Sequence, residues 1–214
     1  MPVTLKLATS LDGRIATAGG ESRWITGEAA REAVHRLRSE HDAVLVGAET
    51  ALADDPELTV RLPGYNGAQP ARVVLDSRQR LPLEGKLAQT ARQIPTYLVA
   101  TTAPDPALVE AGVRILRVRA VSEDRPELRT VVQALAHEGL SRLLVEGGGQ
   151  VAASFLRCGL VDAIEWFRAP VLIGGEGQPA IGALAVAALA EAPHFRRTEV
   201  RAVGDDLWER YERA

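Results

Sequence analysis

Short apolar segments alternate with amphipathic ones from one end of the chain to the other. Val3, Leu5 and Leu7 alternate with polar or small residues, which predicts a strand with one buried face. Short apolar runs predict further strands, at residues 43–47, 71–76, 95–101, 113–118, 141–147 and 161–170. Amphipathic stretches predict helices, at residues 28–41, 126–138 and 150–159. The tail, residues 195–211, alternates as two strands around a Gly204–Asp205 turn.

This order of strands and helices predicts one α/β domain over residues 1–214. Strands separated by helices favour a three-layer domain with a mostly parallel sheet. The final hairpin adds antiparallel strands at the C-terminal edge, which makes the sheet mixed. We expect Thr26 to cap the first helix, residues 10–21 to form a loop, and residues 52–56 to break the chain before Pro56. The alanine-rich segment Ala180–Pro193 is expected to be a packing helix or a surface turn.

Composition removes several classes of function. The 214 residues carry a net charge of −3 and only 4% are aromatic, so we expect no nucleic-acid partner. No apolar run reaches the roughly 18 residues of a membrane span, and the start near Met1 lacks the pattern of a signal peptide. A single cysteine, Cys158, excludes an internal disulfide and a cysteine-rich zinc site. No metal is therefore expected, and a cytoplasmic location is favoured.

An apolar strand runs into three glycines and then a helix at Leu143–Gly149. Backbone N–H groups at such a turn approach a ligand closely, and the helix N-terminus favours an anion, so a phosphate or pyrophosphate fits. A glycine turn that serves tight packing is the alternative, and the local sequence favours neither. Glu146, at the end of the strand, could transfer a proton or accept a hydrogen bond from an amine, or simply cap the turn.

The sequence Asp76-Ser77-Arg78 follows the predicted strand at 71–76. An acid at this place in a nucleotide site favours NAD, whereas a nearby arginine accommodates the 2′-phosphate of NADP. Because a hydroxyl and a guanidinium follow the acid, the pattern favours NADP, with Ser77 and Arg78 as phosphate contacts. An ordinary polar turn is the alternative.

Several dispersed cationic and polar side chains could also bind an anion. They are Lys6, Ser22, Arg23, Arg31, Arg38 and Arg61. Arginine binds phosphate through two parallel hydrogen bonds. Each of these side chains, taken alone, is more typical of a solvated surface.

Several strings, taken together, resemble one family. They are residues 6–16, 20–27, 35–61, 72–82, 143–162 and 169–175. In their order and spacing they resemble the reductase domain of the bacterial bifunctional riboflavin-biosynthesis deaminase–reductase, over nearly the whole chain. The resemblance implies a dihydrofolate-reductase-like fold, a homodimer, and NADPH-dependent reduction of 5-amino-6-(5-phosphoribosylamino)uracil. Because the deaminase domain is absent, the chain is expected to be a stand-alone reductase, a fragment or a relative with a changed substrate.

The resemblance also assigns roles to individual positions. Lys6 matches a family position that faces the active site, and Glu146 matches a substrate-contacting position; these two are the candidate catalytic residues. Positions that match substrate contacts are Ser22, Arg38, Leu58, Arg61 and Glu146. Positions that match NADP contacts are Ala8, Trp24, Thr50, Asp54, Ser77, Gly148, Gly149, Gln150, Val151, Ala152, Ala153 and Ser154. Arg78 is not among them.

In the expected reaction, a hydride is added to C1′ of a ribosylamine that has opened to an imine. Arg38 and Arg61 would anchor the 5′-phosphate, with help from Ser22. Lys6 and Glu146 would orient the opened sugar or the pyrimidine, and solvent could protonate the nitrogen.

Three alternatives stay open. The first is the same reduction of the non-deaminated diaminopyrimidinone, and the second is a related pyrimidine or pteridine (dihydrofolate-like) reductase. The third is a nucleotide-binding module without activity. The arginine pair favours a phosphorylated ribosylaminopyrimidine, because a pterin has no sugar phosphate. Lys6, Asp54 and Glu146 argue against an inactive module.

Overall fold

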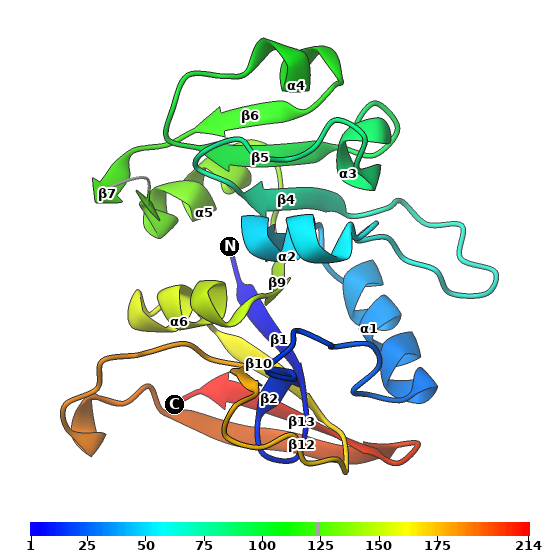
Figure 1. Cartoon of the computed structure of the whole chain (residues 1–214), viewed down its shortest axis with the longest axis vertical. Coiled ribbons are helices and arrows are strands. Elements are labelled where there is room, and N and C mark those ends of the chain that lie inside the picture. Colours follow the sequence, from blue (N-terminus) through cyan, green and yellow to red (C-terminus); the bar gives the residue numbers. More distant parts are fainter. Residues whose placement is uncertain (123–124) are drawn as a thin grey trace. The chain divides into compact units, whose positions relative to one another are not determined.

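The chain folds into two units, each built from segments that are distant in the sequence. The computed structural model describes residues 1–122 and 125–214 (Figure 1). Unit 1 consists of Met1 with Arg36–Leu144, and unit 2 of Pro2–His35 with Val145–Ala214.

Unit 1 is built on four parallel strands in the order β3-β4-β5-β6. They are β3 (Ala43–Gly47), β4 (Ala71–Leu75), β5 (Thr96–Ala100) and β6 (Arg114–Arg117). Each strand pairs in register with the next, from Ala43 opposite Ala71 to Ala100 opposite Arg117. β3 and β5 are buried along their whole length, which is why their sequences are mostly apolar rather than alternating.

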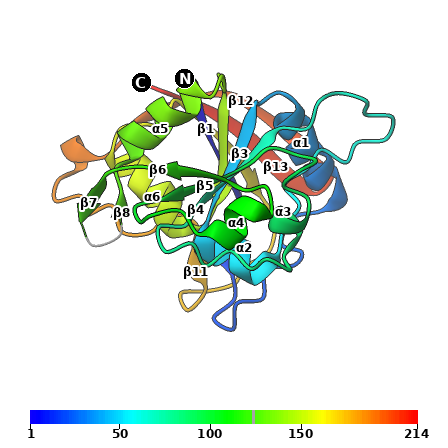
Figure 2. The ribbon, with the colours of Figure 1, turned by 90° about the horizontal axis from the view of Figure 1, so that it is seen from above.

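Short helices connect the strands of unit 1. They are α2 (Ala48–Asp54), α3 (Lys86–Gln89), α4 (Pro106–Glu110) and α5 (Leu128–His137). A small ribbon of β7 (Ala120–Ser122) and β8 (Arg125–Pro126) precedes α5. Figure 2 shows α2 and α5 on opposite sides of the strands of this unit. Unit 1 therefore has the layered arrangement expected for α/β structure.

Unit 2 combines a parallel pair of strands with an antiparallel edge, in the order β12-β13-β10-β1. The strands are β1 (Val3–Thr9), β10 (Ala163–Arg168), β12 (Phe195–Val203) and β13 (Asp206–Arg213). β1 and β10 are parallel, whereas β13 is antiparallel to both β10 and β12. The predicted fold class, mixed and mostly parallel α/β structure with antiparallel C-terminal strands, is confirmed.

Further elements complete the chain. They are α1 (Glu28–Ser39), β9 (Leu143–Gly147), α6 (Gly149–Arg157), β2 (Arg14–Ala16), β11 (Gln178–Pro179) and the short 3-10 helix η1 (Leu189–Glu191). β2 and β11 form a small antiparallel pair. The predicted loop over residues 10–21 is therefore interrupted by a strand, because Arg14 and Ala16 pair with β11.

Two predicted boundaries need correction. The first helix begins at Glu28, so Gly27 rather than Thr26 directly precedes it. The segment 52–56 does not break the chain at its start, because α2 continues to Asp54. The break comes at Asp55, which has a φ of 39° and precedes a proline.

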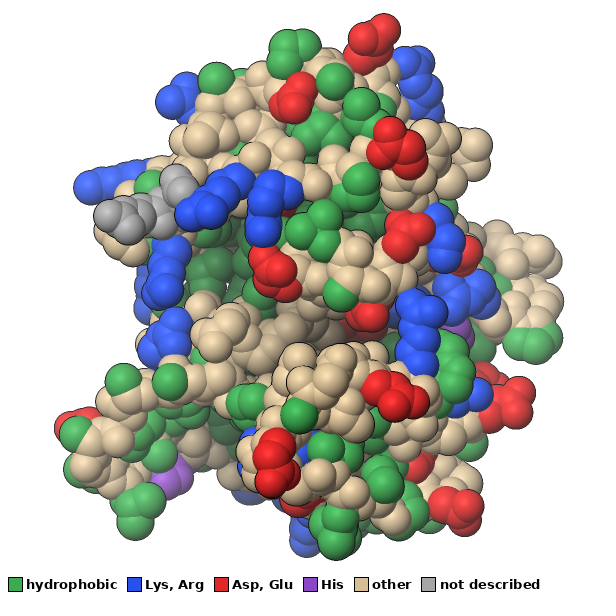
Figure 3. Space-filling model, in the orientation of Figure 1, with side chains coloured by type: hydrophobic (Ala, Val, Ile, Leu, Met, Phe, Trp, Pro, Cys, Tyr) green, Lys and Arg blue, Asp and Glu red, His purple; other side chains and the backbone are tan. Residues whose placement is uncertain are grey.

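The alanine-rich segment Ala180–Pro193 is a surface turn, which is one of its two expected forms. Its one regular element is η1, and Leu189 within it is 88% exposed. Figure 3 shows hydrophobic side chains at the surface of this segment, at the lower left.

Candidate active site

In unit 1, two predicted cofactor positions lie at one edge of the strands. Thr50 belongs to α2, which follows β3 directly, and Ser77 comes two residues after β4. Because β3 and β4 are parallel neighbours, their carboxyl ends share the edge where open α/β sheets bind ligands. Arg80 joins the two segments, since its Nη1 donates to Glu49 Oε1 of α2 (2.8 Å) and its Nε lies 3.5 Å from Asp76 Oδ1.

A buried carboxylate organises the turn after β4. Asp76 is 2% exposed, and its Oδ2 accepts hydrogen bonds from the backbone N–H groups of Arg80 (2.5 Å) and Leu81 (3.0 Å). Ser77 is half-buried and Arg78 is exposed. Asp76 thus serves the backbone of the turn.

The two arginines expected to anchor a phosphate meet at one residue, Thr59. Arg38 Nη1 donates to the backbone oxygen of Thr59 at 2.9 Å, and Arg61 Nη1 lies 3.3 Å from Thr59 Oγ1. Arg61 also pairs with Glu57 at 3.1 Å. Leu58 is buried, with a φ of 54°. A leucine in this left-handed region is unusual and persists where its surroundings enforce it, often at ligand sites. The structure therefore brings the predicted substrate residues of unit 1 together.

Asp54 is the last residue of α2, one helical turn after Thr50. Residues four apart on a helix share one face, so these two predicted cofactor positions point the same way. Asp55, just beyond the helix, accepts a hydrogen bond from the backbone N–H of Lys86 on its Oδ1 at 2.8 Å. That bond fixes the end of α2 and with it the position of Asp54.

In unit 2, Lys6 and Ala8 share one face of β1. Burial alternates along this strand: Val3, Leu5 and Leu7 are buried, and the intervening positions are half-buried. Glu146 lies near the carboxyl end of β9, which neighbours β1 in the sheet order. The two predicted catalytic residues therefore both belong to unit 2 and lie on strands that are neighbours in the sheet.

A buried carboxylate that the sequence did not single out lies beside Lys6 in the sheet. Glu165 of β10 is opposite Lys6 in register and only 1% exposed. It accepts hydrogen bonds from Trp208 Nε1 (2.6 Å) and Arg210 Nη1 (2.7 Å). Burial raises the pKa of Glu165, and these two donors oppose the rise. Its one sequence signal is an acid within an apolar strand.

The glycine turn between β9 and α6 is packed closely. A Cβ on Gly149 would lie 2.5 Å from the backbone oxygen of Pro179, and Gly182 donates its N–H to the Gly149 oxygen at 2.8 Å. Packing therefore accounts for Gly149. Gly148, with a φ of 24°, directly precedes α6. The N-terminus of that helix supplies the partial positive charge expected at an anion site.

Residues further along α6 differ in what they present. Ala152 and Ala153 are buried. The Ser154 hydroxyl donates to the backbone oxygen of Gln150 at 2.8 Å and accepts from Arg157 Nη2 at 2.9 Å. The hydroxyl of Ser154, one of the positions that match NADP contacts, is therefore engaged within α6.

Trp24 is a large exposed aromatic side chain in the loop before α1. It is 69% exposed, and the guanidinium of Arg31 lies 4.7 Å from the centre of its ring. Ser22, in the same loop, is half-buried and accepts a backbone hydrogen bond from Ile25 at 3.2 Å. An exposed indole offers a surface on which a planar ring can stack.

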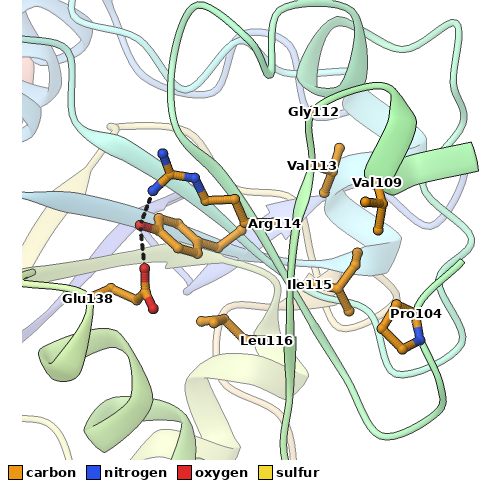
Figure 4. Close-up of a pocket in the computed structure, with 9 residues that line it drawn as sticks. Pro104, Val109, Gly112, Val113, Arg114, Ile115, Leu116 and Glu138 are labelled. Carbon is orange, nitrogen blue, oxygen red and sulfur yellow. Dashed lines mark hydrogen bonds between the residues drawn. The ribbon is translucent and has the colours of Figure 1, made fainter. Parts of the chain in front are cut away.

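A groove at the edge strand β6 of unit 1 contains none of the predicted site residues. It has a volume of about 520 Å³ and an apolar lining that includes Val109 and Ile115. Figure 4 shows its polar end, where Arg114 donates to the Tyr97 hydroxyl (2.9 Å), which donates to Glu138 (3.2 Å).

Among residues 1–122 and 125–214, no group of three His, Cys, Asp or Glu side chains is placed to hold a metal ion. No helix in the described part of the chain is both long and apolar enough to cross a bilayer.

Comparison with known proteins places these features in a family context. The model of the RibD C-terminal domain matches residues 2–208. The chain is 37% identical to riboflavin biosynthesis protein RibD of Actinobacillus pleuropneumoniae over 210 residues, covering 96% of this chain and 55% of that protein. It thus spans about half the length of such relatives. It is also 36% identical over 208 residues to the 2,5-diamino-6-ribosylamino-4(3H)-pyrimidinone 5′-phosphate reductase of Methanothermobacter thermautotrophicus, covering 96% of this chain and 94% of that protein.

Solved structures show the same fold. RibD of Acinetobacter baumannii is 33% identical, with a TM-score of 0.89 over 100% of this chain and 58% of that chain. A diaminohydroxyphosphoribosylaminopyrimidine deaminase/5-amino-6-(5-phosphoribosylamino)uracil reductase of Thermotoga maritima is 28% identical. Its TM-score is 0.81, over 100% of this chain and 56% of that chain.

Proposed function

The chain belongs to the family of RibD C-terminal domains, and we propose that it is an NADPH-dependent reductase of riboflavin biosynthesis. The proposed substrate is 5-amino-6-(5-phosphoribosylamino)uracil, and the product is 5-amino-6-(5-phosphoribitylamino)uracil. The observation that carries the proposal is the meeting of Arg38 and Arg61 at Thr59. Two guanidinium groups at one loop suit a phosphate monoester, which this substrate has and a pterin lacks.

The residues present fit a 2′-phosphorylated nicotinamide cofactor. Ser77 and Arg78 offer a hydroxyl and a cation at the turn after β4, which is the donor set that a 2′-phosphate takes. The start of α6 would hold the pyrophosphate, and the exposed ring of Trp24 would contact a planar ring. When bound, NADPH supplies the hydride that reduces C1′ of the opened ribosylamine. The remaining proposed contacts are Ala8, Thr50, Asp54 and Gly148–Ser154.

The chain's own residues would bind and orient the substrate. Arg38 and Arg61 hold the 5′-phosphate, and Ser22 assists. Lys6 and Glu146 orient the opened sugar or the pyrimidine, which places the reacting carbon for attack. Solvent supplies the proton that the ribosylamine nitrogen gains.

The proposal is tested by following NADPH absorbance with purified protein and enzymatically generated 5-amino-6-(5-phosphoribosylamino)uracil. Dihydrofolate and the non-deaminated diaminopyrimidinone are assayed in parallel. Oxidation that depends on the uracil compound is the expected result. Oxidation with dihydrofolate alone would instead make the chain a pterin reductase, and no oxidation with any substrate would favour an inactive nucleotide-binding module.

Reduction of the diaminopyrimidinone is the second candidate, and one observation favours it. The relative from Methanothermobacter thermautotrophicus, of which this chain covers 94%, is named for that substrate. The two candidates differ in whether reduction precedes deamination. The ratio of kcat/KM values for the two pyrimidines decides between them.

The phosphate anchor is tested by Arg38→Ala and Arg61→Ala. Each variant should raise KM for the phosphorylated substrate, with a loss of about 2 kcal/mol in transition-state binding. The same variants should leave the dephosphorylated substrate unaffected. Arg92→Ala is a matched control, because Arg92 is exposed and bonds the backbone oxygen of Glu110 instead. Equal effects on both substrates would contradict the role of Arg38 and Arg61 as anchors of the 5′-phosphate.

We further propose that the protein is a cytoplasmic homodimer. The resemblance to the reductase family is what supports this proposal. Light scattering coupled to size exclusion measures the state directly, and a monomeric mass would contradict the proposal.

A further inference from the structure

The turn from Asp76 to Arg80 contains a glutamine in a conformation that favours glycine. Gln79 has a φ of 54°, and its N–H donates to the backbone oxygen of Asp76 at 3.0 Å. Non-glycine residues in this region are strained, and they persist where surrounding contacts hold them. The contacts that hold Gln79 therefore determine the shape of the turn.

The side-chain amide of Gln79 is bonded at both ends to the loop after β5. Its Nε2 donates to Thr102 Oγ1 (2.8 Å) and to the backbone oxygen of Ala103 (2.7 Å). Its Oε1 accepts from the backbone N–H of Asp105 at 2.8 Å. The same loop contacts Ser77 directly, because Thr102 Oγ1 lies 3.4 Å from the Ser77 backbone oxygen. One side chain thus fastens the turn to the next loop along the sheet edge.

Arg80 also connects the turn to Glu49 of α2, but this contact is weaker. The ion pair between Arg80 and Glu49 has side chains 42% and 84% exposed, and exposed pairs contribute little because water and salt screen them. The contacts that hold the turn are therefore of two kinds. The Asp76 carboxylate accepts two hydrogen bonds from backbone N–H groups of the turn, and the Gln79 side chain makes three hydrogen bonds to the loop after β5.

We infer that Gln79 is a positioning residue that holds Ser77 and Arg78 in the arrangement that binds the adenosine 2′-phosphate of NADPH. The inference rests on the proposed function. Ser77 and Arg78 stand directly before Gln79, so a change of its backbone conformation moves both donors. A phosphate bound by a hydroxyl and a guanidinium is sensitive to such displacement, because charge-assisted hydrogen bonds require a defined geometry. Gln79 would thereby set the preference for NADPH over NADH.

The test compares Gln79→Ala and Gln79→Gly with the unaltered protein. Gln79→Ala removes the amide bonds, and Gln79→Gly removes them while relieving the backbone strain. Gln89→Ala is the matched control, because Gln89 also donates its amide to a loop carbonyl, that of Leu83, at 2.8 Å. Binding of adenosine 2′,5′-bisphosphate and of 5′-AMP is measured by titration calorimetry, and KM is measured for NADPH and NADH.

Both Gln79 variants should weaken bisphosphate binding and raise the KM for NADPH about tenfold, an effect in the range expected for misplaced binding groups. Binding of 5′-AMP and the KM for NADH should stay unchanged, as should every parameter of Gln89→Ala. Unchanged bisphosphate binding in Gln79→Gly would overturn the inference, and so would equal losses for bisphosphate and 5′-AMP. An unaltered protein that neither binds the bisphosphate nor oxidises NADPH would instead overturn the proposed function.

Discussion

Two turns that follow strands, one in each unit, are built in opposite ways. The turn after β4 is fixed by side chains. The Asp76 carboxylate accepts hydrogen bonds from backbone N–H groups of the turn, and the Gln79 side chain bonds to the loop after β5. The turn after β9 is fixed by the absence of side chains, because Gly149 lets the backbone of Pro179 approach. The first can be altered by deleting atoms and the second by adding them.

The largest effect is expected from Asp76→Ala. The change removes the acceptor of two backbone N–H groups in a site that is 2% exposed, so those groups lose their partner. Urea unfolding should show a loss of about 3 kcal/mol, and NADPH binding should weaken with it. Asp42→Ala is the matched control, because Asp42 also accepts two backbone N–H groups, those of Ser141 and Arg142, at 2.8 and 2.9 Å. The control should lose stability without losing NADPH affinity. If the control lost both, Asp76 would have no specific role in NADPH binding.

Gly149→Ala tests the other construction and should have the next largest effect. The added Cβ would meet the Pro179 oxygen at 2.5 Å, so the start of α6 must shift. Overpacking of this kind costs about 2 kcal/mol in the free energy of unfolding. Gly175→Ala should cost far less, because no atom lies within 4 Å of its Cβ position. If Gly149→Ala were as stable as Gly175→Ala, the packing explanation for this glycine would be wrong.

Much of the fold could be predicted from local pattern, for a physical reason. The burial pattern of β1, β3, β4 and β5 is visible in the few residues of each strand, so alternation or an apolar run reveals them. α2 was missed, because its last residues lie in the Leu52–Pro56 segment that was interpreted as a break. The helix continues to Asp54 and contacts β3 and β4.

The site could be predicted only where the residues that form it are consecutive in the sequence. The glycine turn is visible because its three glycines are adjacent, whereas the bond from Gln79 to Thr102 joins residues 23 apart. Arg72 shows the same limit. It stands in an apolar strand, yet it is only 1% exposed because Thr90 and Thr96 accept its hydrogen bonds. Burial lowers the pKa of Arg72 to about 10. Tertiary partners of this kind cannot be read from the residues beside them.

Arg78→Ala tests whether the two turns bind different parts of the cofactor. If the turn after β4 binds the 2′-phosphate, KM for NADPH should rise about tenfold while KM for NADH stays the same. Gly149→Ala should instead weaken both cofactors, because the pyrophosphate is common to them. Steady-state kinetics of both variants with both cofactors give the four values required. Arg78→Ala acting equally on NADPH and NADH would place the 2′-phosphate elsewhere.

The smallest effect is expected at Asp12, an exposed carboxylate that does in unit 2 what the buried Asp76 does in unit 1. Asp12 accepts hydrogen bonds from Ser10 Oγ (2.6 Å) and from the backbone N–H groups of Ile173 (3.1 Å) and Gly174 (2.8 Å). These donors, the Ser10 hydroxyl first, lower the pKa of Asp12 from 3.8 to about 2. Because the folded pKa lies below the unfolded one, the carboxylate stabilises the fold above about pH 4, and this contribution is lost as the pH falls towards 2.

Asp12→Asn removes the charge and isolates that contribution. The difference in unfolding free energy between the unaltered protein and the variant should be largest near neutral pH and should shrink as the pH falls from 4 to 2. Water competes for an exposed carboxylate, so the whole difference should remain smaller than that of Asp76→Ala. Urea unfolding across this pH range measures it. A difference that does not vary with pH would mean that the shape of the side chain, rather than its charge, holds the two loops together.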